Sequence, residues 1–166
     1  MKITKRALTI DEMDSLSSEM KNFPHIGFID RRLWQKYENI FVATHNNSLI
    51  GVCVAIHLKH WIKLGPLVVR KAFQGRGYGD ALLSYAVYFY KNNDLYIGSA
   101  NPRVWVIADK LGFLKTKNIF CVPFEIQRYL LSYIYERFSY VYLHDAIKKR
   151  LQTTSGQYFY FFKRAS

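Results

Sequence analysis

The chain has 166 residues, half of them hydrophobic, which suits one domain that buries about two-thirds of its unfolded surface. No apolar run approaches the ~20 residues of a membrane-spanning helix, and the first residues show no pattern of a secretory leader. Lysine and arginine number 24 against 12 aspartates and glutamates, so a formal net charge of +12 favours polyanionic partners. We therefore expect a single domain over 1–166 without a membrane span.

The first 70 residues predict two short helices and an antiparallel sheet. Hydrophobic spacing and turn residues predict the following elements in order: strand Lys2–Leu8, helix Asp11–Lys21, helix Asp30–Tyr37, strand Ile40–Thr44, strand Leu49–Leu58 and strand His60–Val69. Asn46 and Asn47 tolerate the positive φ of a tight turn and predict a hairpin between the second and third of these strands. Gly65-Pro66 interrupts the last strand, because proline cannot donate to a sheet ladder, and predicts an edge or a bulge.

A glycine-rich turn, Gln74-Gly75-Arg76-Gly77-Tyr78-Gly79, follows this strand and precedes a helical pattern. Glycines let successive backbone N–H groups face one concavity, and the start of the helix adds unpaired donors and a partial positive charge. Arg70 and Arg76 flank the turn and suit a phosphate-rich ligand. The strand, turn and helix therefore predict an anion site.

The remaining residues predict a parallel strand followed by two helical segments and a final strand. The expected elements are strand Leu95–Ser99, helix Pro102–Leu111, strand Phe113–Val122, helices Glu125–Phe138 and Tyr140–Leu151, and strand Gln157–Lys163. Ligands in such sheets gather at the carboxyl ends of parallel strands, here near Val69 and Ser99–Asn101.

Two segments together resemble the GNAT superfamily of acyl-CoA-dependent N-acyltransferases. Gln74, Gly77 and Gly79 match its Q/R-x-x-G-x-G/A motif, and the segment from Asn101 to Leu111-Gly112-Phe113 is similar to a second family segment. The resemblance implies an α/β fold, with a mixed, mostly antiparallel sheet and helices on both faces. The helices expected over about 124–152 depart from the family as an insertion before the last strand.

The resemblance also implies acetyl-CoA as the cofactor and a set of residues that hold it. Backbone groups on the strand would hold the pantetheine arm, the turn would hold the pyrophosphate, and the strand bulge would open a gap for the arm. The implied residues are Leu67, Val68, Val69, Gln74, Gly75, Arg76, Gly77, Tyr78, Gly79 and Asn101. Asn101 has an alternative role as the N-cap of the helix that begins at Pro102.

The residues for proton transfer differ from those of many family members. Ala108 stands where many members carry a tyrosine that protonates the leaving thiolate, and no acidic residue lies between Glu38 and Asp80. His57 and His60 are the catalytic candidates that remain, with an alternative as solvent-facing turn residues. Tyrosines near the C-terminus, including Tyr158 and Tyr160, are further candidates, and some members work without a strong base.

The basic excess suggests an amine substrate carried on a polyanion such as aminoacyl-tRNA, with Lys148-Lys149-Arg150 as a dense cluster. The alternatives are a catalytically weak module that binds acyl-CoA or nucleic acid, an enzyme for a small free amine, and a generally basic surface. Cys53 and Cys121 lie in apolar runs and are predicted to be buried thiols rather than metal ligands, which fits a cytoplasmic protein. No metal site is predicted, and a homodimer is one alternative for the oligomeric state.

Overall fold

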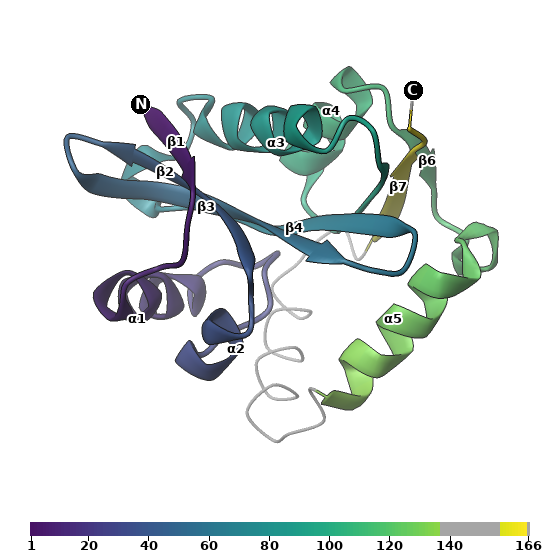
Figure 1. The fold of residues 1–166 in the computed structure, drawn as a ribbon, viewed down its shortest axis with the longest axis horizontal. Helices are drawn as coiled ribbons and strands as arrows, with labels where there is room; N and C mark the ends of the chain where they lie inside the picture. The colour runs from purple at the N-terminus through teal and green to yellow at the C-terminus, as the bar shows by residue number, and fades with distance from the viewer. Residues whose placement is uncertain (137–156, 166) are drawn as a thin grey trace.

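A computed structural model describes residues 1–136 and 157–165 of the chain (Figure 1). The sheet of the described part has seven strands in the order β1-β2-β3-β4-β5-β7-β6. The strands are β1 (Lys2–Lys5), β2 (Asn39–His45), β3 (Ser48–His57), β4 (Trp61–Val69), β5 (Asp94–Ser99), β6 (Leu114–Thr116) and β7 (Phe159–Lys163). The helices are α1 (Ile10–Met20), α2 (Arg31–Gln35), α3 (Tyr78–Phe89), α4 (Pro102–Lys110) and α5 (Phe124–Glu136), with short 3-10 turns η1 (Lys71–Phe73) and η2 (Ile119–Cys121).

Helices cover both faces of the sheet, as the family resemblance implied. Figure 1 shows α3 and α4 over one face, and α1, α2 and α5 over the other. Leu82 and Leu83 of α3 pack with Ile62 of β4 in one hydrophobic cluster, while Leu16 of α1 packs with Val68 of β4 in another. In the described sheet, only β4 and β5 pair in parallel; the other neighbouring strands are antiparallel. The mixed, mostly antiparallel α/β fold is confirmed.

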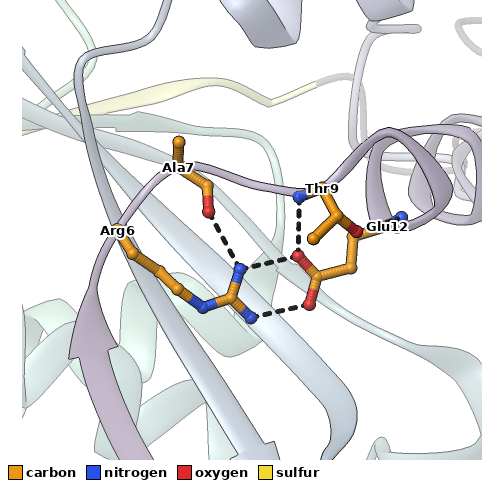
Figure 2. Close-up of polar contacts among 4 residues, drawn as sticks. All are labelled: Arg6, Ala7, Thr9 and Glu12. Atoms are coloured by element: carbon orange, nitrogen blue, oxygen red, sulfur yellow. Dashed lines mark hydrogen bonds and ion pairs between the residues drawn. The ribbon is translucent and has the colours of Figure 1, made fainter.

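The connection from β1 to α1 is fixed by a polar network (Figure 2). The Thr9 hydroxyl accepts from Glu12 N (3.2 Å), and Thr9 N donates back to the Glu12 carboxylate (2.9 Å), which makes a capping box. Arg6 donates to both oxygens of that carboxylate at 2.7 Å and to the Ala7 carbonyl at 2.9 Å. This network ends β1 at Lys5, before the predicted Leu8.

The β2–β3 turn and the bulge in β4 both appear where they were predicted. Asn46 and Asn47 have φ values of 48° and 60°. Cys53 pairs with Leu67 and Ala55 with Leu64, so Gly65 and Pro66 stand opposite the single residue between them and form the bulge.

The pairing between β4 and β5 is short. It joins Trp61–Lys63 to Asp94–Tyr96 and ends there. The carboxyl-terminal part of β4, which leads into the glycine-rich turn, therefore pairs with β3 and not with β5.

The prediction of a strand over Phe113–Val122 is wrong beyond Thr116. β6 covers only Leu114–Thr116, because the Asn118 side chain accepts from Phe120 N (2.9 Å) and caps the η2 turn. Cys121 lies in that turn and is exposed, so its prediction as a buried thiol is also wrong, whereas Cys53 is buried as predicted.

The predicted helix Tyr140–Leu151 and the Lys148-Lys149-Arg150 cluster lie outside the described residues. Within residues 1–136 and 157–165, no helix is long and apolar enough to cross a membrane.

Candidate functional site

A cavity of about 690 Å³ lies where four segments meet. Its lining comes from residues 23–26 after α1, from Leu67 and Val69 of β4, from the stretch between 73 and 80, and from the stretch between 101 and 107. All the predicted cofactor residues except Val68 and Arg76 line it. One cavity therefore brings together segments that are far apart in the sequence.

The glycine-rich turn has the backbone shape of an anion site. Gly75 and Gly77 have φ values of 79° and 78°, and Gly77 is the N-cap of α3. A Cβ added at either glycine would meet no atom of the described chain within 4 Å. The backbone conformation therefore favours glycine at both positions, and the open space beside them is part of the cavity. The Gln74 side chain donates to the Val69 carbonyl at 2.9 Å and ties the turn to the end of β4.

The end of β4 presents alternate residues to the two faces of the sheet. Leu67 and Val69 pack toward α3 and line the cavity, whereas the Val68 side chain is fully buried on the opposite face. Arg70 N donates to the Ile50 carbonyl of β3 (2.9 Å). Successive amides of a strand point to opposite edges, so the N–H of Val69 points away from β3, toward the side where β5 has separated.

The two flanking arginines do not line the cavity. Arg70 Nε donates to the Glu19 carboxylate of α1 at 2.7 Å, and Lys71 N donates to its other oxygen at 2.9 Å. Arg70 therefore fastens the end of β4 to α1. Arg76 is exposed, and of the charged side chains in the described part, Asp80 and Arg103 line the cavity.

Asn101 takes the capping role that was one of its two alternatives. Its side-chain oxygen accepts from Arg103 N at 3.0 Å, and its own N–H donates to the Ser99 hydroxyl at 3.0 Å. It also lines the cavity, so a contact with the cofactor arm stays a prediction.

The two histidine candidates lie elsewhere. His57 is exposed, and its Nε2 lies 3.4 Å from the Tyr90 hydroxyl. His60 is exposed too; its backbone N–H donates to Glu125 at 3.1 Å, and its Nε2 lies 3.5 Å from the other Glu125 oxygen. Neither histidine lines the cavity. Ala108, a residue of α4, is fully buried in the core.

The tyrosine candidates gather beside β5 instead. A Cβ added at Gly98 would lie 2.3 Å from the Tyr158 hydroxyl and 2.5 Å from the Tyr96 hydroxyl. Burial raises the pKa of Tyr96 and, less strongly, that of Tyr160, so both phenols stay protonated at neutral pH.

Sequence reasoning missed His25. It lines the cavity from the loop after α1, and its Nδ1 is buried without a hydrogen-bond partner among the described residues. No pattern in the sequence separates this histidine from His45, because the loop reaches the cavity only through the packing of α1 and α2.

Comparison with protein-family models matches residues 36–118, half of the chain, to the acetyltransferase (GNAT) domain. The chain therefore belongs to the GNAT acetyltransferase family, as its motifs indicated. No curated protein matches the sequence.

Solved structures share the fold at low sequence identity. N-acetylglutamate synthase from Neisseria gonorrhoeae, complexed with coenzyme A and N-acetyl-glutamate, matches with a TM-score of 0.63 and 12% identity; the match covers 100% of this chain and 36% of that one. A GNAT family acetyltransferase from Elizabethkingia anophelis with acetyl-CoA bound matches with a TM-score of 0.54 and 24% identity, over 74% and 84% of the two chains. Ribosomal-protein-alanine N-acetyltransferase from Brucella melitensis matches with a TM-score of 0.57 and 17% identity, over 70% and 86%. The chain thus spans about a third of the first of these proteins.

Proposed function

We propose that the protein transfers an acetyl group from acetyl-CoA to an amine. The observation that carries this proposal is the turn Gln74–Gly79, where two glycines with positive φ stand at the start of α3 and line the cavity. The backbone amides at the start of α3 suit the pyrophosphate of the cofactor, and family membership and the acetyl-CoA-bound structure with the same fold support the choice of cofactor.

The end of β4 would hold the reacting group. A thioester arm that runs from the turn along Leu67 and Val69 passes the N–H of Val69, which points away from β3. Attack by an amine turns the thioester carbonyl into an oxyanion, and a fixed N–H donor at that place stabilises the developing charge. Electrostatic stabilisation and positioning are the contributions that this chain's backbone supplies.

We further propose that the acceptor amine is carried on a polyanion, with aminoacyl-tRNA as the leading candidate. Support comes from the net charge of +12. Some of the basic side chains make contacts within the fold, and others are exposed. Arg70 pairs with Glu19, Arg164 pairs with Asp94, and Lys163 donates to the Leu111 carbonyl. Lys59, Lys71, Arg76, Arg103 and Arg128 are exposed.

A transfer assay tests both proposals. The protein is incubated with acetyl-CoA labelled in its acetyl group, and the label is followed into bulk aminoacyl-tRNA, into amino-acid amides and into polyamines. Label in the tRNA fraction supports the polyanion proposal, label only in small amines supports the rival enzyme, and no label in any fraction supports the weak binding module.

Retention of bulk tRNA at two salt concentrations separates binding from turnover. If phosphate contacts carry the interaction, log affinity falls linearly with log salt, by roughly 0.7 to 0.9 for each contact. An absence of retention at the lower salt would remove nucleic acid from the proposal and leave acetyl transfer to a small amine.

A further inference from the structure

The cavity reaches both faces of the sheet. The stretch between 101 and 107 belongs to α4, which covers the same face as α3, whereas residues 23–26 belong to the loop between α1 and α2 on the other face (Figure 1). Phe23 packs in the cluster beneath α1, while Leu67 and Val69 pack against the cluster beneath α3. The cavity therefore extends past the end of β4, from one face of the sheet to the other.

The two ends of this cavity differ in chemistry. The α3–α4 end holds the turn of free amides, Arg103 and the start of two helices, all of which suit the phosphates of a nucleotide. The other end is lined by Phe23, Pro24, His25 and Ile26, which suit a smaller and less charged group. If acetyl-CoA places its pyrophosphate on the turn, the end that remains for the amine is the one that contains His25.

His25 is the nitrogen base of the cavity among the described residues. The other titratable side chains of the lining stand at the α3–α4 end: Asp80 accepts from the Ser84 hydroxyl at 3.2 Å, the Arg103 guanidinium has donors and no acceptor, and Tyr78 packs edge-on against Phe73. Because His25 Nδ1 has no partner in the described chain, no carboxylate or carbonyl fixes the tautomer of the ring. The ring is half-buried and Nδ1 is the nitrogen closed to solvent, so Nε2 is the nitrogen that can meet a ligand in the cavity.

We propose, building on the acetyl transfer proposed above, that His25 contacts the acceptor amine and takes its proton. The amine nitrogen attacks the carbonyl carbon, the C–N bond forms, and the C–S bond breaks with its electron pair moving to sulfur. The imidazole takes the proton that the nitrogen loses and passes it to solvent, and the thiolate takes up a proton and leaves as CoA. His25 thus takes the role of general base, for which β4 carries no acidic residue.

Bromoacetyl-CoA tests this position without a known acceptor. An imidazole nitrogen beside the acyl group displaces bromide from the carbon next to the carbonyl, and mass spectrometry of peptides locates the new N–C bond. The experiment uses a Cys121→Ser background, because that cysteine is exposed and would react by itself. His45, exposed at the end of β2, is the matched reference in the same chain.

We expect labelling of His25 to be at least about tenfold faster than that of His45, because the bound reagent is held beside it. Excess acetyl-CoA should suppress the labelling of His25 and leave that of His45 unchanged. An unlabelled His25 in a protein that binds acetyl-CoA, or labelling that acetyl-CoA does not suppress, would overturn the proposal. Calorimetry with acetyl-CoA precedes the labelling, so a chain that does not bind it refutes the proposed function itself and this inference with it.

A variant pair gives the kinetic counterpart. In the transfer assay, His25→Gln should lower turnover by about 10²-fold or more at saturating acetyl-CoA, which is the usual effect of removing a general base. Its affinity for acetyl-CoA should stay unchanged, and His45→Gln should leave both quantities unchanged. Equal turnover of His25→Gln and wild type would contradict the role of His25.

Discussion

Gly77 and Gly112 form a natural pair for testing the anion site. Both have positive φ, 78° and 76°, and both stand at helix ends, the first before α3 and the second after α4. A Cβ at Gly77 meets nothing within 4 Å in the described chain, and one at Gly112 meets only Lys163 Nζ at 3.9 Å. Alanine therefore costs the same backbone strain at both positions, with no steric clash.

The strain of a non-glycine residue in the left-handed region is roughly 1–2 kcal/mol. For a domain of this size, each 1 kcal/mol lowers the melting temperature by about 2–4 °C. Gly77→Ala and Gly112→Ala should thus both melt about 2–8 °C below wild type. Their effects on ligand binding should differ, because only Gly77 lines the cavity.

At Gly77 the added methyl group occupies the space that we assign to the pyrophosphate. Losing one amide contact to a charged oxygen costs about 1.5–3 kcal/mol, which corresponds to roughly 10- to 100-fold in affinity. Calorimetry should therefore show weaker acetyl-CoA binding for Gly77→Ala and wild-type binding for Gly112→Ala. Unchanged affinity of a folded Gly77→Ala, or an equal loss in both variants, would refute the assignment of the turn.

Three further predictions concern stability and reactivity. Asn101→Ala should lower the unfolding free energy by about 1 kcal/mol through loss of the α4 cap, and Asn101→Asp should not; equal melting temperatures would argue against the cap. Burial raises the pKa of Cys53 to about 12, so a thiol reagent should count one reactive cysteine, Cys121, in the native protein and two after unfolding, whereas two in the native state would contradict the burial. The hydrogen bond from Arg6 lowers the pKa of Glu12, so its stabilisation is present above the unfolded pKa near 4.5 and is lost as pH falls through the folded value. The stability difference between wild type and Glu12→Gln should accordingly shrink between neutral pH and about pH 3, and a constant difference would refute this linkage.

The sequence predicted the parts of the fold whose cause is local. Asn46-Asn47 sets its turn through positive φ, and the glycines between 75 and 79 mark the anion turn. In each case the residues that cause the structure are the residues that adopt it.

The features that sequence reasoning missed depend on contacts between distant segments. The apolar run that contains Cys121 looks like a strand, but β7 is the only partner of β6 in the described sheet and pairs with just three of its residues. Arg70 looks like a phosphate ligand until α1 brings Glu19 against it. His25 reaches the cavity only because a loop beneath the sheet folds toward the end of β4.

We propose that acetyl-CoA bound at the Gln74–Gly79 turn gives its acetyl group to an amine. The most direct measurement counts acetyl groups found on amines and CoA thiols released in the same reaction, for wild type and for Gly77→Glu. The predicted result is equal numbers of both products for wild type, and neither product for a folded Gly77→Glu, whose carboxylate would stand where the pyrophosphate binds. Thiol release without any acetylated amine, or equal turnover of the two proteins, would contradict the claim.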